Sequence, residues 1–361
     1  AIVDADKTWA ADYRQDVIVS TAEMGARTKE IINAIRSYYA NLALDDISAV
    51  TIVTPVGAQI ETVGTVDLTA YLSEASASMQ GVGADALTAS IVAVSKDGAA
   101  VMGDYAAFAL TSGTYTITYR FTHAESGKFA EASFVIVVSS EYDIVNGGFE
   151  TGDLRGWTYE QGTGDGQVDG ANAISSDESF WAEEIPFNQG GNYHFHGWTA
   201  NPTEANAYKI TSSTFTLGGS GYISFKMGGA NAVVKVFTAD GTQIAEYRNT
   251  EYADINFPYV EYGSRNGTMT TFVADLSAYL GEELYLELHD SGAGGWGVAF
   301  FDDIVTYYET APVVSECFDT VMIRARVQTG TDENGNPIYA QAAEKTEYQL
   351  AWKTAVNVYQ S

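Results

Sequence analysis

The chain has 361 residues, with 47 acidic and 18 basic side chains and a net charge of −29 when histidine is neutral. Nucleic acids and anionic membrane surfaces would repel so acidic a protein, which excludes both as partners. Cys317 is the only cysteine and no run of about 18 apolar residues occurs, which excludes an intrachain disulfide and a membrane-spanning helix. The first residues show no signal peptide pattern, so we expect a removed signal or, preferably, a fragment of a longer protein.

The N-terminal segment, residues 1–47, is predicted to be helical, mainly over residues 7–44. Its second half has apolar side chains at the spacing of one helix face, namely Ile31, Ile32, Ile35, Tyr38, Tyr39 and Leu42. Thr28 is the predicted N-cap of this half, and Gly25 is a predicted break. We interpret the segment as a helix that packs on a neighbouring domain, with a coiled-coil or partner-binding helix as the alternative.

Residues 48–140 are predicted to form an immunoglobulin-like β-sandwich. Strand patterns cover Ala49–Val53, Thr65–Leu68, Ala89–Val94, Thr114–Phe121 and Ala132–Val138. In the fourth, Tyr115, Ile117, Tyr119 and Phe121 alternate and should share one face. The stretch SGTYTITYRFTHAESGKFAEASFVIVV resembles the last hairpin of bacterial Ig-like domains, which implies a spacer.

Residues 141–310 are predicted to form a second all-β domain, a jelly-roll sandwich. Its strand patterns cover Tyr193–Trp198, Ser213–Leu217, Tyr222–Met227, Val233–Thr238, Thr270–Asp275, Leu284–Leu288 and Val298–Tyr307. Asp240-Gly241 is a hairpin turn signal. Trp157 is expected in the core.

The C-terminal segment, residues 311–361, is predicted to be a hairpin followed by a helix. Thr320–Gln328 and Pro337–Gln341 would pair about Asn334-Gly335. The spacing of Tyr348, Ala351, Trp352, Ala355 and Tyr359 then predicts the helix. Asp332 begins a pattern like a calcium loop, but Pro337 and Ala343 stand where glycine and glutamate are needed, so that site is rejected.

Three carboxylates lie near the two ends of the predicted jelly roll, Glu150 at its start and Asp302 and Asp303 at its end. If the ends meet, a hard cation such as Ca²⁺ would relieve their repulsion, with Asn146 and the carbonyl near Gly148 as further ligands. Neighbouring strand residues point to opposite faces, so one of the two aspartates is expected to be the direct ligand, without a choice between them. The alternative is a turn with solvated acids.

The same stretches carry a family resemblance. NGGFETGDLRGW and WGVAFFDDIVTYYE resemble the ends of jelly-roll carbohydrate-binding modules of bacterial glycoside hydrolases. IPFNQGGNYHFHGW, EYRNTEYADINFP and VADLSAYLGEELYLELHD narrow the likeness to the module that accompanies levanases and fructosidases. The resemblance implies an extracellular or cell-surface module with structural calcium that binds levan or another fructan, within a longer chain of neighbouring domains.

Sugar binding needs aromatic rings for stacking and planar polar groups for paired hydrogen bonds. The predicted ligand residues are Glu183, His194, Trp198, Arg248, Asn249, Glu251, Asp254, Asp290 and Trp296. Further candidate rings are Trp181, Tyr247 and Tyr252. Arg248 stands out in a domain poor in basic residues, and a surface salt bridge is its alternative role.

Three alternatives accompany the non-catalytic glycan-binding interpretation. His194 and His196 share a strand face and could hold zinc with His289 or Asp290, although the spacing gives no regular third ligand. Glycoside hydrolysis would require two carboxylates at one cleft, for instance Glu183 or Glu184 with Asp254 or Asp290. A structural stalk of a surface adhesin with a protein ligand is the last alternative.

Overall fold

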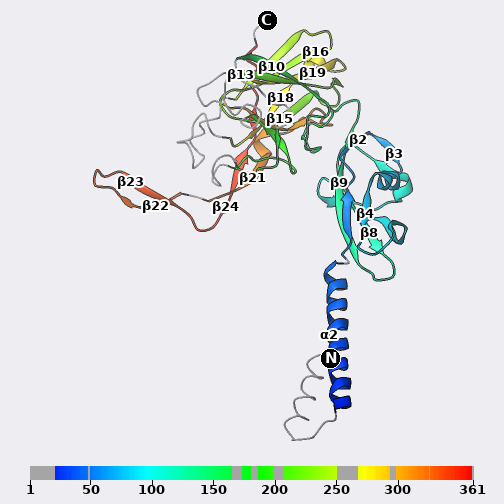
Figure 1. Cartoon of the computed structure of the whole chain (residues 1–361). Helices are drawn as coiled ribbons and strands as arrows, with labels where there is room; N and C mark the ends of the chain where they lie inside the picture. The colour runs from blue at the N-terminus through cyan, green and yellow to red at the C-terminus, as the bar shows by residue number, and fades with distance from the viewer. Residues whose placement is uncertain are drawn as a thin grey trace. The chain divides into compact units, whose positions relative to one another are not determined.

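The computed structural model describes residues 21–47, 49–164, 173–179, 186–197, 206–249, 267–292, 298–324 and 326–359. The expected ligand residues Glu183, Trp198, Glu251, Asp254 and Trp296 lie outside these ranges. β-Strands dominate the described residues, which confirms the predicted all-β class (Figure 1). None of the described helices is long and apolar enough to cross a membrane.

The chain forms two compact units with interleaved segments. Unit 1 comprises Ala1–Val56, Asp67–Ala93 and Thr118–Ser133, and unit 2 comprises Gly57–Val66, Val94–Ile117 and Phe134–Ser361. The domain boundaries expected near residues 48, 141 and 311 stay predictions.

Unit 1 contains the helix α2 (Thr21–Ile47), the 3₁₀ helix η1 (Leu68–Glu74) and the strand pair β1 (Thr51–Thr54) and β4 (Ser76–Ser78). The helix runs without interruption through Gly25 and Thr28, so the predicted break and N-cap are wrong. One glycine costs a helix about 1 kcal/mol, which the good helix formers around Gly25 can offset. Ile32, Ile35 and Tyr38 of the apolar face are exposed.

A five-stranded sheet is formed by residues 59–139. Its order is β2-β9-β8-β5-β6, with β2 (Gln59–Thr62), β9 (Phe129–Ser139), β8 (Gly113–His123), β5 (Leu87–Lys96) and β6 (Ala99–Ala100). The short strands β3 (Gly64–Val66) and β7 (Phe108–Leu110) form a separate pair. The alternating residues Tyr115, Ile117, Tyr119 and Phe121 of β8 are all buried, which confirms the predicted shared face. The immunoglobulin-like likeness stays a prediction.

Unit 2 contains a β-sandwich of two six-stranded sheets (Figure 1). Sheet 1 has the order β10-β13-β19-β16-β17, with β14 beside β19; its strands are β10 (Trp157–Gly164), β13 (Asn206–Ser212), β19 (Glu283–Asp290), β16 (Ala232–Thr238), β17 (Gln243–Arg248) and β14 (Phe215–Thr216). Sheet 2 has the order β11-β12-β20-β15-β18-β25; its strands are β11 (Ile174–Ser175), β12 (His194–His196), β20 (Phe300–Val305), β15 (Tyr222–Gly228), β18 (Thr270–Asp275) and β25 (Lys353–Thr354).

The core lies between the two sheets and follows the alternation of their strands. Sheet 1 contributes Ile210, Val234 and Leu286, and sheet 2 contributes Phe195, Phe225 and Phe301, all buried in one cluster. Trp157 belongs to this cluster, as predicted, and its indole N–H donates to the carbonyl of Asn146 at 3.1 Å. Because side chains alternate along a strand, the intervening residues point away from this core.

The C-terminal segment is built from strands. β21 (Phe318–Ile323) pairs with β24 (Thr346–Ala351), and β22 (Arg326–Thr331) pairs with β23 (Pro337–Gln341) as a hairpin that confirms the predicted turn at Asn334-Gly335. Figure 1 shows this hairpin extending away from β21 and β24. The helix predicted from Tyr348 to Tyr359 is wrong, because β24, β25 and a bridge at Asn357 occupy that stretch.

Residues 353–358 form a strap across the side of the sandwich where both sheets end. β25 pairs in parallel with β18 of sheet 2, and Ala355 donates from its N–H to the carbonyl of Val273 at 2.8 Å. Three residues later, the N–H of Val358 donates to the carbonyl of Glu246 in β17 of sheet 1 at 2.8 Å. The strap thus gives hydrogen-bond partners to two sheet edges that would otherwise be open.

Candidate functional site

A β-bulge in β20 brings both aspartates to one face of sheet 2. Ser224 is opposite Val305 and Lys226 is opposite Asp302, so two steps along β15 match three along β20. Asp303 has a φ of 46°, the left-handed conformation that such an extra residue needs. The expectation that Asp302 and Asp303 point to opposite faces is therefore wrong, since simple alternation fails at a bulge.

Glu150 comes from the loop that precedes β10, and its carboxylate is held by a second loop. The N–H groups of Asn192 and Tyr193 donate to Glu150 Oε1 at 2.8 and 2.9 Å. In the same second loop, the N–H of Gly190 donates to Asp302 Oδ2 at 2.7 Å. The loop over residues 190–193 is therefore bonded to carboxylates from both ends of the sandwich.

The three carboxylates converge on glycines. A Cβ placed on Gly148 would lie 3.8 Å from Asp303 Oδ1, 4.0 Å from Asp302 Oδ1 and 3.8 Å from Glu150 Cγ. A side chain at Gly190 would overlap the carboxylate of Asp303, and one at Gly191 would overlap that of Glu150. The absence of side chains at these glycines leaves the space in which the carboxylates approach one another.

Asn146 organises the first loop. Its side-chain N–H₂ donates to Thr151 Oγ1 at 2.8 Å and to the carbonyls of Asp153 and Arg155 at 3.1 and 3.0 Å. Asn146 is thus bonded within its own loop, and its expected role as a metal ligand stays a prediction. Both Asn146 and Phe149 have left-handed backbones, with φ of 57° and 54°. Such conformations cost about 1–3 kcal/mol each and persist where the surroundings enforce them.

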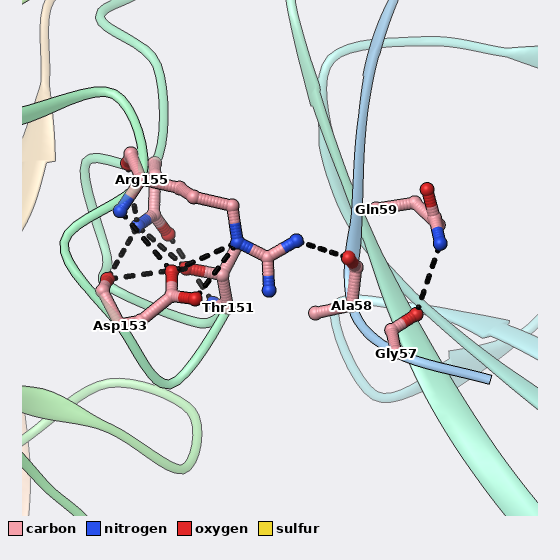
Figure 2. A network of polar contacts seen from close by, with 7 residues as sticks. Gly57, Ala58, Gln59, Thr151, Asp153 and Arg155 are labelled. Atoms are coloured by element: carbon pink, nitrogen blue, oxygen red, sulfur yellow. Dashed lines mark hydrogen bonds and ion pairs between the residues drawn. The ribbon is translucent and has the colours of Figure 1, made fainter. Parts of the chain in front are cut away.

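Asp153 and Arg155 brace the same loop from outside (Figure 2). Asp153 Oδ1 accepts from Thr151 Oγ1 at 2.8 Å and from Arg155 Nε at 3.0 Å. The far end of the Arg155 guanidinium donates to the carbonyl of Ala58, which also belongs to unit 2. The loop that carries Glu150 is therefore fixed by a polar network as well as by Trp157.

Lys226 supplies the positive charge at the carboxylates. Its Nζ lies 2.7 Å from Asp303 Oδ2, and its side chain is only 8% exposed. Burial lowers the pKa of Lys226, but the charge and hydrogen bond of Asp303 outweigh burial and raise it above the usual value. Burial, with the charge of Asp303 second, raises the pKa of Asp302 well above its usual range. Burial also raises the pKa of Glu150, although the N–H donors of residues 192 and 193 oppose it.

The donor set at this site fits a hard cation. Each oxygen of Asp302 accepts one N–H and keeps a lone pair for a metal, whereas both oxygens of Glu150 already accept two N–H bonds from residues 192 and 193. Ca²⁺ takes about six to eight oxygens including backbone carbonyls. Burial is the main cause of the raised pKa values of Glu150 and Asp302, with the charge of Asp303 adding to it. Within the described ranges, no three acidic, histidine or cysteine side chains are arranged as a ready metal group. A bound ion would therefore draw on backbone carbonyls as well as on the carboxylates.

Two of the three carboxylates, those of Glu150 and Asp303, line a cavity of about 640 Å³ within unit 2. Glu150, Asn192 and Asp303 form part of its wall, with Asp97 and Asp143 elsewhere on the lining. The cavity gives an ion a path to the carboxylates from solvent.

Two of the expected ligand residues, Asn249 and Asp290, lie together at one end of sheet 1. Asp290 is opposite Ala232 in the sheet, and the N–H of Asn249 donates to the Ala232 carbonyl at 3.0 Å. Both side chains are buried, with Asn249 donating to the carbonyl of Gly229 at 2.8 Å. Asp290 Oδ1 accepts from the N–H of Gly292 at 3.2 Å. The fold thus makes these two residues neighbours, and their role in ligand binding stays a prediction.

Tyr208 joins this pair and was not among the expected ligand residues. It is opposite Asp290 in β13, is 2% exposed, and its hydroxyl has no hydrogen-bond partner among the described residues. Burial, with the nearby charge of Asp290, raises the pKa of Tyr208 well above its usual value. A buried hydroxyl without a partner costs about 1–3 kcal/mol, and a ligand group or a water molecule bonded to it would remove that cost.

Arg248 lies apart from that group, on the outer face of sheet 1. Its side chain is 51% exposed, and its guanidinium is 2.5 Å from Glu246 Oε1. Tyr247, the candidate ring beside it, is 3% exposed and belongs to the core, so it cannot stack on a sugar. The expected cluster of residues 247–254 is therefore divided between a core, an outer face and residues outside the described ranges.

His194 and His196 lie on the outer face of sheet 2, in an aromatic cluster with Phe187 and Phe300. The ring centroids of His194 and Phe187 are 4.2 Å apart, and those of the two histidines are 5.4 Å apart. Burial lowers the pKa of His194 to about 3 and that of His196 to about 4. The alternative zinc site with His289 is wrong, because His289 lies in sheet 1 and bonds to Glu287 at 2.8 Å. Asp290, the other suggested third ligand, is also in sheet 1.

Lys226, Asn192 and Tyr208 are the site residues that sequence reasoning missed. Lys226 could have been found from the sequence, because a lysine inside the apolar strand Tyr222–Gly228 needs a buried counter-charge. Tyr208 lies in a strand whose polar composition gave no strand prediction. Asn192 acts through its backbone, which no side-chain pattern reveals.

Comparisons with known proteins give only distant likenesses. No family profile and no curated protein matches the chain. Among solved structures, TmCBM61 in complex with β-1,4-galactotriose is 18% identical, with a TM-score of 0.29, over 45% of this chain and 96% of that one. The enzymatically active domain of bacteriophage CBA120 tailspike protein 4 is 13% identical, with a TM-score of 0.29, over 47% of this chain and 22% of that one.

A third likeness is to the CBM51-2 and INT domains of Clostridium perfringens ZmpB. It is 14% identical, with a TM-score of 0.21, over 70% of this chain and 47% of that one. Two of these three structures contain carbohydrate-binding modules. At such TM-scores, none of the likenesses carries an argument about the function of this chain.

Proposed function

We propose that this chain is a non-catalytic glycan-binding module with a structural Ca²⁺ site, part of a longer extracellular or cell-surface protein. The observation that carries glycan binding is the meeting of Asp290 and Asn249 at one end of sheet 1, where the ring of Tyr208 belongs to the core and only its hydroxyl, which has no partner among the described residues, is offered to a ligand. A hydroxyl, a carboxylate and an amide together suit the hydroxyl groups of a neutral sugar. The sequence resemblance to modules of levanases supports a fructan as the sugar and a glycoside hydrolase as the parent protein.

Ca²⁺ is proposed at Glu150, Asp302 and Asp303, with backbone carbonyls near Gly148 completing the set. These residues come from the two ends of the sandwich, and an ion between them would hold the first loop of the domain against its last strand. Its contribution would be structural, because nothing at the site suggests bond breaking. Mass action predicts a stabilisation of about 2.7 kcal/mol when the ion is present at a hundred times its dissociation constant.

Calorimetric titration of the full chain with levan, inulin, fructose and a β-1,4-galactan tests glycan binding. Tyr208→Phe should weaken binding about tenfold, the value of one lost hydrogen bond, without loss of stability. The matched control is Tyr285→Phe, since Tyr285 stacks on Phe237 at 5.1 Å on the outer face of sheet 1. Absence of binding to every glycan, or an unchanged affinity in Tyr208→Phe, contradicts this part of the proposal.

Melting with 1 mM calcium and with excess chelator tests the metal. Glu150→Gln should abolish most of the calcium-dependent increase in melting temperature, because it removes one carboxylate charge from the site. Glu160→Gln is the control, since the side chain of Glu160 is 56% exposed and lies 3.6 Å from Lys209 in another part of the domain. Equal melting of the unmodified chain in calcium and chelator would exclude the ion.

A structural stalk is the second candidate, and the ion pair of Arg248 with Glu246 favours it. An arginine engaged in an internal pair is less available to hold sugar hydroxyls. Arg248→Ala distinguishes the two, with Arg120→Ala as the control because Arg120 makes a similar exposed pair with Glu131 at 2.5 Å. A selective loss of glycan affinity in Arg248→Ala favours the glycan-binding module.

A further inference from the structure

Lys226 stands out as a buried cation within a site that we assign to a metal ion. Of the described lysines and arginines, it alone forms an ion pair with Glu150, Asp302 or Asp303. Its strand, β15, lies between β20 and β18 in the middle of sheet 2. Lys226 and a bound metal ion would both place positive charge beside the same carboxylates, so the presence of the lysine needs an explanation.

The position of Lys226 is fixed by its strand neighbours. Phe225 and Met227 are 0% and 1% exposed and belong to the core, so alternation directs Lys226 to the opposite face, toward the carboxylates. With 8% of its side chain exposed, the ammonium has little access to water as an alternative partner. Lys226 is therefore a permanent part of the site.

Lys226 also determines how Asp303 is used. Asp303 Oδ2 is taken by the ammonium at 2.7 Å, whereas Oδ1 lies on the side of Gly148. Asp303 can thus bind Lys226 with one oxygen and an ion with the other. This arrangement keeps Asp303 in place whether or not an ion is present.

The net charge of the three carboxylates and Lys226 matches that of a divalent cation. When all three carboxylates are ionised, they contribute three negative charges, and Lys226 reduces the sum to two. We propose that Lys226 is a built-in counter-cation that matches the site to a divalent ion and keeps it assembled in the absence of metal. This inference rests on the proposed metal binding at Glu150, Asp302 and Asp303.

Two ions of similar size and different charge test the proposal, Ca²⁺ and Tb³⁺. Their affinities are measured by titration of the full chain and of Lys226→Met, which keeps the length of the side chain without its charge. Loss of one positive charge a few ångströms away should favour Tb³⁺ over Ca²⁺ by about tenfold relative to the unmodified chain. In chelator, Lys226→Met should also melt at a lower temperature and recover more than the unmodified chain when calcium is added.

Two controls accompany the measurement. Lys226→Arg keeps the charge and should leave the ratio of affinities unchanged. Lys209→Met removes a lysine that bonds to Glu287 at 2.6 Å on sheet 1, and it should not change the ratio either. If Lys226→Met does not fold, Lys226→Gln replaces it, with the same expected direction.

The outcomes separate the two proposals. A ratio that is the same in Lys226→Met and in the unmodified chain, with calcium still bound, overturns the role of Lys226 and leaves the metal site standing. Failure of the unmodified chain to bind either ion overturns both. A tenfold change of the ratio in Lys226→Met alone supports the counter-cation.

Discussion

The two ion pairs Lys226–Asp303 and Arg248–Glu246 differ in surroundings rather than in length. Their nitrogen–oxygen distances are 2.7 and 2.5 Å, respectively. The cationic side chain is 8% exposed in the first pair and 51% exposed in the second. In the first pair the ammonium has little access to solvent, although Asp303 is 40% exposed, whereas Arg248 can exchange Glu246 for water at little cost.

This difference in exposure sets the two ion pairs apart. The carboxylates around Lys226 come from distant parts of the chain, Glu150 from one end of the sandwich and Asp302 and Asp303 from the other, and they meet only when the sandwich is folded. Arg248 and Glu246 are two residues apart on one strand and would meet in almost any packing of the sheet. We therefore expect the first pair to report on the integrity of the fold, and the second to contribute little to it.

The largest effect is expected for Asp303→Ala, which leaves the buried ammonium of Lys226 without its partner. In chelator, the free energy of unfolding should fall by about 3 kcal/mol, because removing one member of a buried pair exposes the full cost of the other charge. Urea denaturation measures it. The double variant Asp303→Ala/Lys226→Met should recover part of the loss, and a double variant no more stable than the single one would contradict this account.

Acidic pH should destabilise the protein through His194, which is buried in its neutral form. The pKa of His194 is lowered from 6.5 to about 3, so below pH 6.5 the unfolded chain binds a proton that the folded chain does not. Its contribution to stability is therefore complete above pH 6.5 and falls as the pH decreases, by about 2 kcal/mol at pH 5.

Denaturation of the chain and of His194→Phe at pH 7.5 and 5.0 measures this term. The variant should lose about 2 kcal/mol less than the unmodified chain on acidification. Comparing variants is necessary because the raised pKa values of Glu150 and Asp302 act with the opposite sign, favouring the folded state at low pH. Equal losses in both proteins would show that His194 is hydrated.

An intermediate effect is expected for Asp319→Ala, a carboxylate bonded to neutral donors. Asp319 accepts from Thr271 Oγ1 at 2.7 Å, Asn188 Nδ2 at 3.2 Å and Trp352 Nε1 at 3.0 Å. Loss of these bonds should cost about 1.5 kcal/mol in urea denaturation. Asp319→Asn keeps part of the network and should lose less, whereas an equal loss would assign the effect to charge alone.

The smallest effect is expected for Glu246→Ala. Because Arg248 is half exposed, the free energy of unfolding should change by no more than about 1 kcal/mol, and 0.5 M salt should remove most of that change. Denaturation at two salt concentrations measures it. A loss as large as that of Asp303→Ala would mean that both pairs are structural and that the contrast between them fails.

Sequence patterns predicted the strands with strong alternation. β8, β15, β16, β18 and β20 were predicted because apolar side chains alternate along them. β10, β13 and β17 were missed, since each mixes charged or polar residues with few apolar ones. Their place in the sheet comes from hydrogen bonding to neighbours, which the sequence alone does not show.

Of the two sites expected from the sequence, the structure brings the residues of one together and separates those of the other. Three acidic residues at the two ends of one domain were enough to predict that Glu150, Asp302 and Asp303 meet, and the structure brings them together around Gly148. The ligand cluster expected from adjacent residues was not kept together, because neighbours in a strand point to opposite faces. Asn249 and Asp290, distant in sequence, became neighbours through Ala232.

By itself, the sequence determined that the chain is all-β and that Trp157 is buried, because the alternation of apolar side chains is a local property. Tertiary structure decided the bulge at Asp303, the burial of Lys226 and the extended strap at residues 353–358. The strap shows the reason most directly. Its residues have the spacing of a helix, but two open sheet edges offer backbone hydrogen bonds that an isolated short helix could not match.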